Sequence, residues 1–324
     1  MSTEGMRRPT FIRKSIASRH RRWDDYGVLP YLLVLPLVVF IGALVLYPTV
    51  LTFVESFFRV NPLDPPVRFI AIQNYLSVFT SPDVNQAWIN TFLYVLIGVS
   101  LSTIMALLVA LGLQRNFRGR AVVLAILVLP WALPAVTEGI IWSWIYDPDF
   151  GVLNSILHSA GIIKQYRVWL SQSRLATIFL IEVVQIWQIS PLATILILSS
   201  LQSIPDELYD AAQVDGAGSL TRLFTMILPL IRPGITVAVV QSLIVSLNIF
   251  AQVYVLNGNA LSGSSIMLQT YNVAFQNLNF GEGYALSFSV VILTMLLSTG
   301  ILRFVYAAWL NFAYHGGAPS GNTG

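Results

Sequence analysis

The chain has 324 residues, of which 56% are hydrophobic and only 10% are charged, with a net charge of +3 and no cysteine. Soluble domains carry about 25% charged residues, so this composition excludes an ordinary soluble domain and indicates that most side chains face lipid or other apolar helices. The absence of cysteine excludes disulfide frameworks and thiolate metal sites, and His20, His158 and His315 have no partner at ligand spacing.

Residues 1–26 form a basic segment that holds seven of the eighteen Lys and Arg residues of the chain. Two interpretations are open: an anchor on an anionic cytoplasmic leaflet, or a tail that only sets the orientation in the membrane, which is the interpretation we favour. The apolar run that follows is much longer than the apolar core of a signal peptide, so no cleavage is expected.

Six apolar runs are each near the ~20 residues that a helix needs to cross a bilayer. They fall at residues 28–53, 88–114, 121–146, 174–200, 234–256 and 286–312. The connecting segments between them are too short to form a second folded domain. The sequence therefore predicts an all-α membrane protein with six transmembrane helices in a single domain.

The distribution of basic residues predicts the orientation of these helices. The basic tail, the turn at 115–120 and the polar loop at 202–233 together hold twelve of the eighteen Lys and Arg residues. The positive-inside rule places these three segments in the cytoplasm. We therefore expect a membrane domain over residues 27–312, a second cytoplasmic tail at 313–324, and both termini in the cytoplasm.

The polar loop at 202–233 predicts two short helices joined at a glycine corner. Ser203 and Asp206 resemble a capping box, and Pro205 fits the first helical turn. Gly216 is expected to end the first helix because glycine adopts the left-handed conformation without strain. Ser219 would cap a second helix, whose apolar stripe is formed by Leu220, Leu223, Phe224, Ile227 and Leu228 and which Pro229 and Pro233 would close.

Polar side chains recur on one face of the fourth and fifth apolar runs. The two sets are Glu182, Gln185 and Gln188, and then Gln241, Asn248 and Gln252. They predict either a polar pathway for a solute or hydrogen bonds between helices, worth about 0.6 kcal/mol each, and the sequence does not decide between them. Amide side chains suit a neutral, polyhydroxylated solute better than an ion.

Glu138 follows Pro130 and Pro134, which we expect to bend or break the third span near the middle of the membrane. Its carboxylate would either accept hydroxyl groups of a solute or extend towards the outer surface, and we favour the second interpretation.

No energy source is encoded in the chain. The only lysines are Lys14 and Lys164, and neither follows a glycine as the lysine of a phosphate-binding Walker A loop does. A nucleophile elbow and a cluster of metal ligands are also missing from the sequence, which argues against an enzyme.

The loop sequence Asp210-Ala211-Ala212-Gln213-Val214-Asp215-Gly216-Ala217, followed by Leu228-Pro229, resembles the EAA motif of ABC importer permeases. In that family the motif reads Glu-Ala-Ala-x-x-Asp-Gly-Ala, so Asp210 replaces the usual glutamate. Further similar residues occur at Trp88, Asn90, Leu129-Pro130 and Trp187. Over residues 27–312 the chain resembles the maltose- and glycerol-phosphate-type permeases, in particular their shorter first subunits.

This resemblance implies a permease subunit of an ATP-driven sugar importer in a prokaryotic cell membrane. The helix at 204–214 would be a coupling helix that docks on a separate cytoplasmic ATPase dimer, which carries the ATP and Mg²⁺. The implied coupling residues are Glu207, Asp210, Ala211, Ala212, Asp215, Gly216, Ala217 and Pro229.

The other implied partners are a homologous second permease, an extracytoplasmic solute-binding protein and the sugar; no nucleic acid, metal or cofactor is expected in this chain. The alternatives are a permease for another polar solute such as glycerol phosphate, or a secondary transporter that needs no ATPase. The lack of Lys and Arg within the fourth and fifth spans favours an uncharged sugar.

Overall fold

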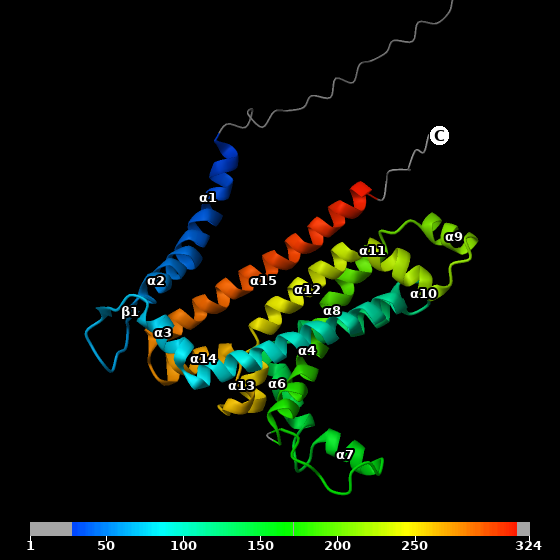
Figure 1. Ribbon diagram of the computed structural model, residues 1–324. Helices are drawn as coiled ribbons and strands as arrows, with labels where there is room; N and C mark the ends of the chain where they lie inside the picture. Colours follow the sequence, from blue (N-terminus) through cyan, green and yellow to red (C-terminus); the bar gives the residue numbers. More distant parts are fainter. Residues whose placement is uncertain (1–27, 171, 316–324) are drawn as a thin grey trace, which may run out of the picture. The chain divides into compact units, whose positions relative to one another are not determined.

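The computed structural model describes residues 28–170 and 172–315 (Figure 1). The chain divides into two compact units, residues 1–51 and 52–324, each described here by itself. The predicted cytoplasmic tail at 1–26 lies outside the described residues, and so do residues 316–324 of the predicted C-terminal tail. The described residues are mainly helical.

The first apolar span begins in the first unit and ends at the start of the second. Helix α1 (Leu29–Ile41) continues into a π-helical turn, η2 (Gly42–Leu46), and then into α2 (Tyr47–Glu55). The helical run Pro30–Glu55 is long and apolar enough to cross a membrane, as the sequence predicted for residues 28–53.

A small hairpin and a helix follow α2 in the second unit. Strand β1 (Phe58–Arg59) pairs with β2 (Arg68–Phe69) in antiparallel register, and Arg59 forms an ion pair with Asp64 in the connecting turn. Helix α3 (Gln73–Thr80) was not predicted. It holds the hairpin because the buried Asn74 donates hydrogen bonds to the carbonyl oxygens of Ser56 (2.7 Å) and Phe58 (2.8 Å).

Three helices pack against one another in the centre of the second unit: α4 (Pro82–Leu113), α8 (Arg174–Leu201) and α12 (Arg232–Leu247) (Figure 1). Small residues allow the close approach, because Ala106 and Ala110 on α4 are fully buried. At Gly234, on α12, an added Cβ would lie only 2.0 Å from Ser200 Oγ on α8. The centre of the unit is therefore formed by backbones in near contact.

The third span is broken, as its two prolines predicted. Helix α5 (Arg120–Val128) is followed by a 3₁₀ turn, η3 (Pro130–Ala132), and by α6 (Ala135–Ile145), and the two parts meet at 99°. Proline lacks the N–H for a helical hydrogen bond and its ring displaces the preceding carbonyl, which explains the break. Helix α7 (Val152–Ser159) lies in the segment that leads to α8.

The fifth span is not the continuous helix that the sequence predicted over 234–256. Helix α12 ends at Leu247, and the chain resumes a helix only at α13 (Ala251–Asn257). Asn248 caps α12, since its side-chain amide donates to the carbonyl of Ile244 at 2.7 Å. An asparagine that bonds the preceding turn in this way competes with continuation of the helix.

The polar loop precedes α12 and contains α9 (Asp206–Val214), α10 (Ser219–Arg222), a π-helical turn η4 (Leu223–Ile227) and α11 (Leu228–Leu230). The helical run Ser219–Leu230 meets α12 at 71°. In Figure 1 this loop lies at one end of the central helices, and α6 and α13 lie at the other.

The remaining elements are η5 (Leu261–Gly263), α14 (Ile266–Tyr271), η6 (Asn272–Gln276) and the long helix α15 (Phe280–His315). Within the described residues, four helices are long and apolar enough to cross a membrane, and the number is six if each bent pair counts as one span. The last span begins earlier than the predicted residue 286 because helical structure extends into the polar segment before it.

Candidate functional site

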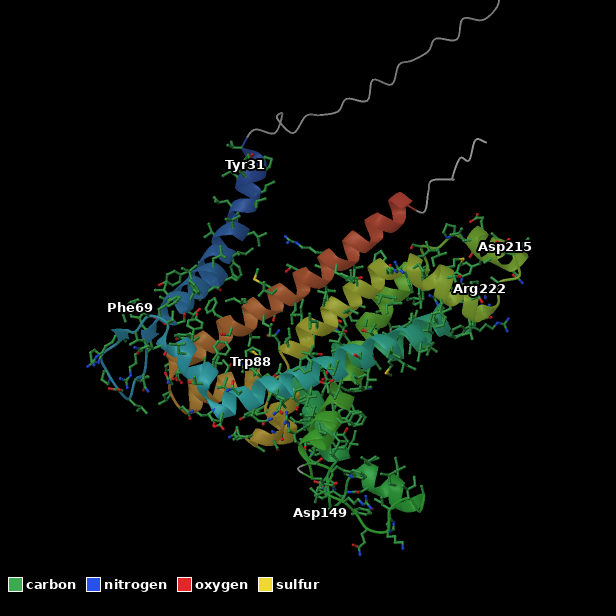
Figure 2. The ribbon with its side chains drawn as sticks, viewed as in Figure 1. Tyr31, Phe69, Trp88, Asp149, Asp215 and Arg222 are labelled. Atoms are coloured by element: carbon green, nitrogen blue, oxygen red, sulfur yellow. The ribbon has the colours of Figure 1, made fainter. Side chains whose placement is uncertain are left out.

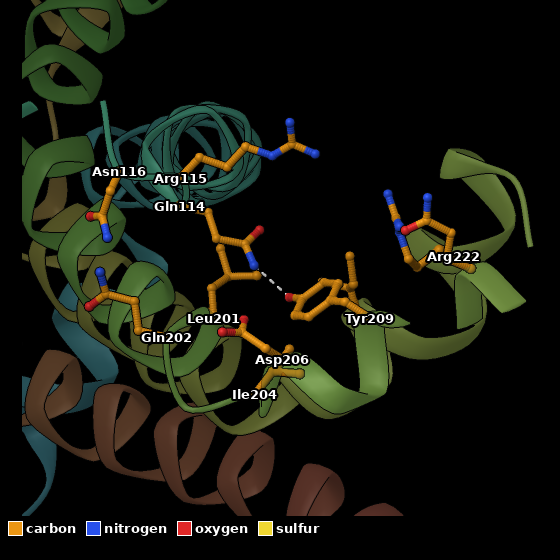
Figure 3. A pocket seen from close by; sticks show the side chains of 11 residues that line it. Gln114, Arg115, Asn116, Leu201, Gln202, Ile204, Asp206, Tyr209 and Arg222 are labelled. Carbon is orange, nitrogen blue, oxygen red and sulfur yellow. Dashed lines mark hydrogen bonds between the residues drawn. The ribbon is translucent and has the colours of Figure 1, made fainter. Parts of the chain in front are cut away.

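Helix α9 is attached to the central helices along one edge. Ile204, just before the helix, is buried in the core that α4 and α8 share. The Tyr209 hydroxyl accepts a hydrogen bond from Gln114 Nε2 at 2.5 Å, at the end of α4 (Figure 3). The guanidinium of Arg222 lies 5.9 Å from the centre of the Tyr209 ring, in a cation–π contact.

The other side of α9 is open to its surroundings. The carboxylates of Glu207, Asp210 and Asp215 are exposed, and none of them forms an ion pair with a described residue. Figure 2 shows Asp215 at the far end of the loop. Ala211 is exposed, and Ala212 and Ala217 are half-buried, so small side chains separate the acidic ones. Glu207, Asp210 and Ala211 of the predicted coupling residues are therefore accessible on α9.

The glycine corner has the predicted conformation. Gly216 has φ +72°, and the N–H of Ala217 bonds the carbonyl of Ala212 at 3.0 Å. This bond spans five residues and is typical of a Schellman cap, in which glycine is the residue without strain. Gly216 thus fixes the angle at which the chain leaves α9.

Three details of the predicted loop are wrong. Ser203 makes no capping box, because its hydroxyl donates to the carbonyl of Ser200 at 2.8 Å and Pro205 is the residue before the first turn. Ser219 lies inside α10 and Gly218 precedes it, so Ser219 is not a cap. The half-buried Pro229 does not close the second helix, which continues to Leu230.

Part of the predicted apolar stripe of the loop is exposed, which the sequence did not predict. Leu220 is 71% exposed and Phe224 is 65% exposed, whereas Ile227 of the same stripe is buried. Val214, at the end of α9, is 87% exposed. Helical periodicity predicts which residues share one face of a helix, but it does not predict which part of that face is covered by the core.

A cluster of buried polar side chains around Glu182 lies between the central helices. Glu182 and Gln185 on α8 are fully buried, and their side-chain polar atoms have no hydrogen-bond partner among the described residues. A Cβ added at Gly98 of α4 would lie 2.6 Å from Glu182 Oε2 and 2.8 Å from Ser246 Oγ of α12. Gly98 therefore provides the space in which the Glu182 carboxylate meets both neighbouring helices.

Glu138 does not extend to the outer surface, and this expectation is corrected. Its side chain is fully buried, and Gln252 Nε2 on α13 donates a hydrogen bond to Glu138 Oε2 at 3.2 Å. The break before α6 turns this helix against α13, where Gly139 contacts Val255. The sharp bend is thus the reason that the carboxylate faces protein.

The six predicted pathway residues do not share a single surface. Gln188 and Gln241 are half-buried and Asn248 is exposed, whereas Glu182, Gln185 and Gln252 are buried. The break after α12 separates Gln252 from Gln241 and Asn248, which the sequence placed on one helical face. Within the described residues, no group of acidic and histidine side chains has the arrangement of a metal site.

Comparison with known proteins identifies relatives over most of the chain. Residues 98–311 match the family described as "binding-protein-dependent transport system inner membrane component". The trehalose/maltose transport system permease protein MalF of Thermococcus litoralis is 33% identical over 272 residues, 83% of this chain and 89% of the relative. The sulfoquinovosyl glycerol transport system permease protein SmoG of Agrobacterium fabrum is 32% identical over 294 residues, 89% of this chain and 94% of the relative.

A solved structure has the same fold. One chain of a bacterial alginate ABC transporter, in complex with an alginate pentasaccharide-bound periplasmic protein, superimposes with a TM-score of 0.77. The two chains are 21% identical, and the match covers 89% of this chain and 98% of that one. Together with the sequence matches, this shows a membrane-embedded permease subunit of an ATP-driven importer and not an enzyme. The chain belongs to the family of binding-protein-dependent transport system inner membrane components.

Proposed function

We propose that this permease subunit imports an uncharged saccharide together with a homologous second permease, a cytoplasmic ATPase dimer and an extracytoplasmic solute-binding protein. The relatives named for trehalose/maltose and sulfoquinovosyl glycerol support a carbohydrate. An uncharged one is favoured because neither α8 after Arg174 nor α12 after Arg232 contains Lys or Arg, which an anionic solute would need.

The exposed surface of α9 is the observation that supports ATPase coupling. Glu207 and Asp210 offer carboxylates to a basic partner, and the small Ala211 and Ala212 allow its backbone to approach. The helix is joined to α4 through the hydrogen bond between Gln114 and Tyr209, and to α12 through the rest of the loop. A movement of an ATPase bound at α9 would therefore be transmitted to the central helices.

The pathway for the solute is proposed from the accessible amides. Gln188, Gln241 and Asn248 are the members of the predicted set whose side chains are not buried, and they would be the ones that contact the solute. Glu182 and Gln185 would support the pathway from behind, where they are enclosed by α4 and α12. Gln252 would act through Glu138, to which it is hydrogen-bonded.

The test of coupling is Gly216→Pro. Proline is fixed near φ −65°, so it cannot adopt the +72° of Gly216, and it lacks the N–H that bonds Gln213 at 3.1 Å. We expect saccharide uptake by cells to be lost while the chain still inserts into the membrane. The matched control is Gly161→Pro, because Gly161 also has φ +72° but lies in the segment between α7 and α8.

Normal uptake by the Gly216→Pro variant would contradict the proposal. Uptake by the purified chain alone in liposomes, without any ATPase, would instead show a secondary transporter. The Gly161→Pro control should retain uptake, because the same backbone strain then lies away from α9.

A further inference from the structure

A cavity of about 510 Å³ lies between the end of α4 and the polar loop (Figure 3). Its apolar floor includes Leu201, Ile204 and Ile227. Its walls are polar, and α9 forms one of them through Tyr209. The cavity is thus separate from the exposed carboxylates of Glu207 and Asp210 on α9 and from the cluster of buried polar side chains around Glu182.

Two guanidinium groups line this cavity without a carboxylate partner. They belong to Arg115, two residues beyond the end of α4, and to Arg222 of α10. Among the described residues, the one ion pair joins Arg59 and Asp64 in the hairpin β1–β2. Neither arginine of the cavity therefore has a carboxylate that neutralises its charge. The contact of Arg222 with the Tyr209 ring positions its guanidinium but leaves its charge in place.

The remaining polar groups also favour an anion. The side-chain amides of Asn116, Gln202 and Gln213 line the cavity, and their nitrogens donate no hydrogen bond to a described residue. The one carboxylate in the lining is Asp206, so positive groups outnumber negative ones. Guanidinium forks and amide donors match the several acceptor oxygens of a phosphate group.

The position of the cavity along α4 suggests the source of the phosphate. Arg115 lies where the apolar helix ends, and Arg118 and Arg120 follow in the same turn. Basic residues immediately beyond a transmembrane helix lie at the depth of lipid headgroups and attract anionic ones. A headgroup of the adjacent leaflet would therefore reach this cavity from the side.

We propose that the cavity binds a phosphate group, carried by an anionic lipid of the adjacent leaflet or free in solution. The phosphate bridges Arg115 beyond α4 and Arg222 on the polar loop. It adds a second connection between these elements beside the hydrogen bond of Gln114 with Tyr209, and so it holds α10 against the central helices.

The test uses the full chain purified in a neutral detergent, with thermal unfolding as the readout of binding. The probes are short-chain phosphatidic acid, short-chain phosphatidylcholine and inorganic phosphate. Phosphatidic acid is expected to raise the unfolding midpoint, and the net-neutral phosphatidylcholine is not. A rise with inorganic phosphate at equal concentration identifies free phosphate as the source, and a rise with phosphatidic acid alone identifies lipid.

Variants separate this cavity from general charge effects. Arg115→Gln with Arg222→Gln should weaken binding by about tenfold or more for each guanidinium lost, because hydrogen bonds to charged groups are the strong ones. The matched control is Arg118→Gln, which removes an exposed charge from the same turn but not from the cavity lining, and it should bind as the unaltered chain does.

Asp206→Asn provides a change of opposite sign. Removal of the one carboxylate in the lining should tighten phosphate binding severalfold. A loss of folding cannot produce tighter binding. The measurement also remains possible if the double arginine variant does not fold. The proposal is overturned if phosphatidic acid and phosphate leave the midpoint unchanged, if Arg118→Gln loses as much affinity as the double variant, or if Asp206→Asn binds no tighter.

Discussion

Glu182 is a carboxylate inside the chain with no hydrogen-bond partner among the described residues. An ionised carboxylate in the middle of a membrane helix costs about 2.5–3.5 kcal/mol on insertion scales, so such a residue is rarely retained without a role. Gly98 makes the space for it, and any other residue there would place a Cβ at 2.6 Å from its oxygen. The two residues therefore have to be considered together.

Asn248 permits the most direct test of the solute pathway. Asn248→Leu removes an exposed amide and should raise the half-saturating saccharide concentration for uptake about tenfold. A hydrogen bond between the amide and the saccharide contributes about 0.5–1.5 kcal/mol, and the bond that caps the end of α12 is lost as well. The measurement is saccharide uptake against concentration, with the amount of inserted protein determined in parallel.

Asn248→Ser is the control for the structural part of this effect. Serine bonds the preceding turn as asparagine does, so it should keep the end of α12 and lose only part of the affinity. Unchanged uptake kinetics in Asn248→Leu would show that the amide serves the helix end and not the solute.

At the scale of elements, Asn154 organises the segment between α6 and α8. Its side chain is fully buried and bonds the backbone of Arg167 in both directions, donating at 2.9 Å and accepting at 3.1 Å. It also accepts a hydrogen bond from the Trp169 indole at 3.0 Å and donates to the carbonyl of Asp147 at 3.2 Å. One amide thus connects both ends of this segment.

Asn154→Ala should release the segment and expose it to trypsin at Lys164 and Arg167. Loss of a buried partner costs about 1–3 kcal/mol, enough to raise the population of the open segment by roughly tenfold or more. Limited proteolysis of the purified chain measures this as a faster appearance of two fragments. Ser155→Ala removes a bond to the carbonyl of Gly151 at 3.2 Å and an exposed bond between its hydroxyl and that of Tyr166 at 3.1 Å. It should be cleaved much more slowly than Asn154→Ala, because water can replace an exposed hydrogen bond.

The sequence predicts elements well where the signal is local. An apolar run of ~20 residues, a pair of prolines and a glycine corner each act through the few residues around them. The break near Pro134 and the turn at Gly216 were therefore predictable, and so were the apolar helical runs other than the fifth, which is interrupted after Leu247.

Features that depend on a choice between partners were not predictable. The amide of Asn248 ends α12, and Ser203 bonds Ser200 instead of a helix start, because each side chain selects a nearby carbonyl that the sequence does not single out. Glu138 was expected at the surface because its partner Gln252 is 114 residues away. The exposed side of α9 was inferred from the resemblance of its residues to a motif.

At the scale of the whole molecule, the polar loop and the turn at 115–120 line the same cavity and thus lie at the same end of the central helices. This agrees with their common assignment to one side of the membrane. The segment at 261–263 lies beyond α13, on the opposite side in the proposed topology.

The absence of native cysteine makes this topology directly testable. Val214→Cys and Ser262→Cys each introduce one exposed thiol into the chain. A membrane-impermeant maleimide added to intact cells or spheroplasts should label Ser262→Cys at once and Val214→Cys only after permeabilisation. The reverse pattern, or equal labelling of both, would contradict an arrangement with both termini in the cytoplasm.

The contact between α6 and α13 has a mechanical consequence. Each follows an interruption of helical structure, at Pro134 in one case and at residues 248–250 in the other. The bond between Glu138 and Gln252 and the contact of Gly139 with Val255 join these helices to each other. A movement of α12 would therefore reach α13 through the short non-helical segment at 248–250. Because α13 contacts α6, these two helices, far apart in sequence, would move together at the end opposite the polar loop.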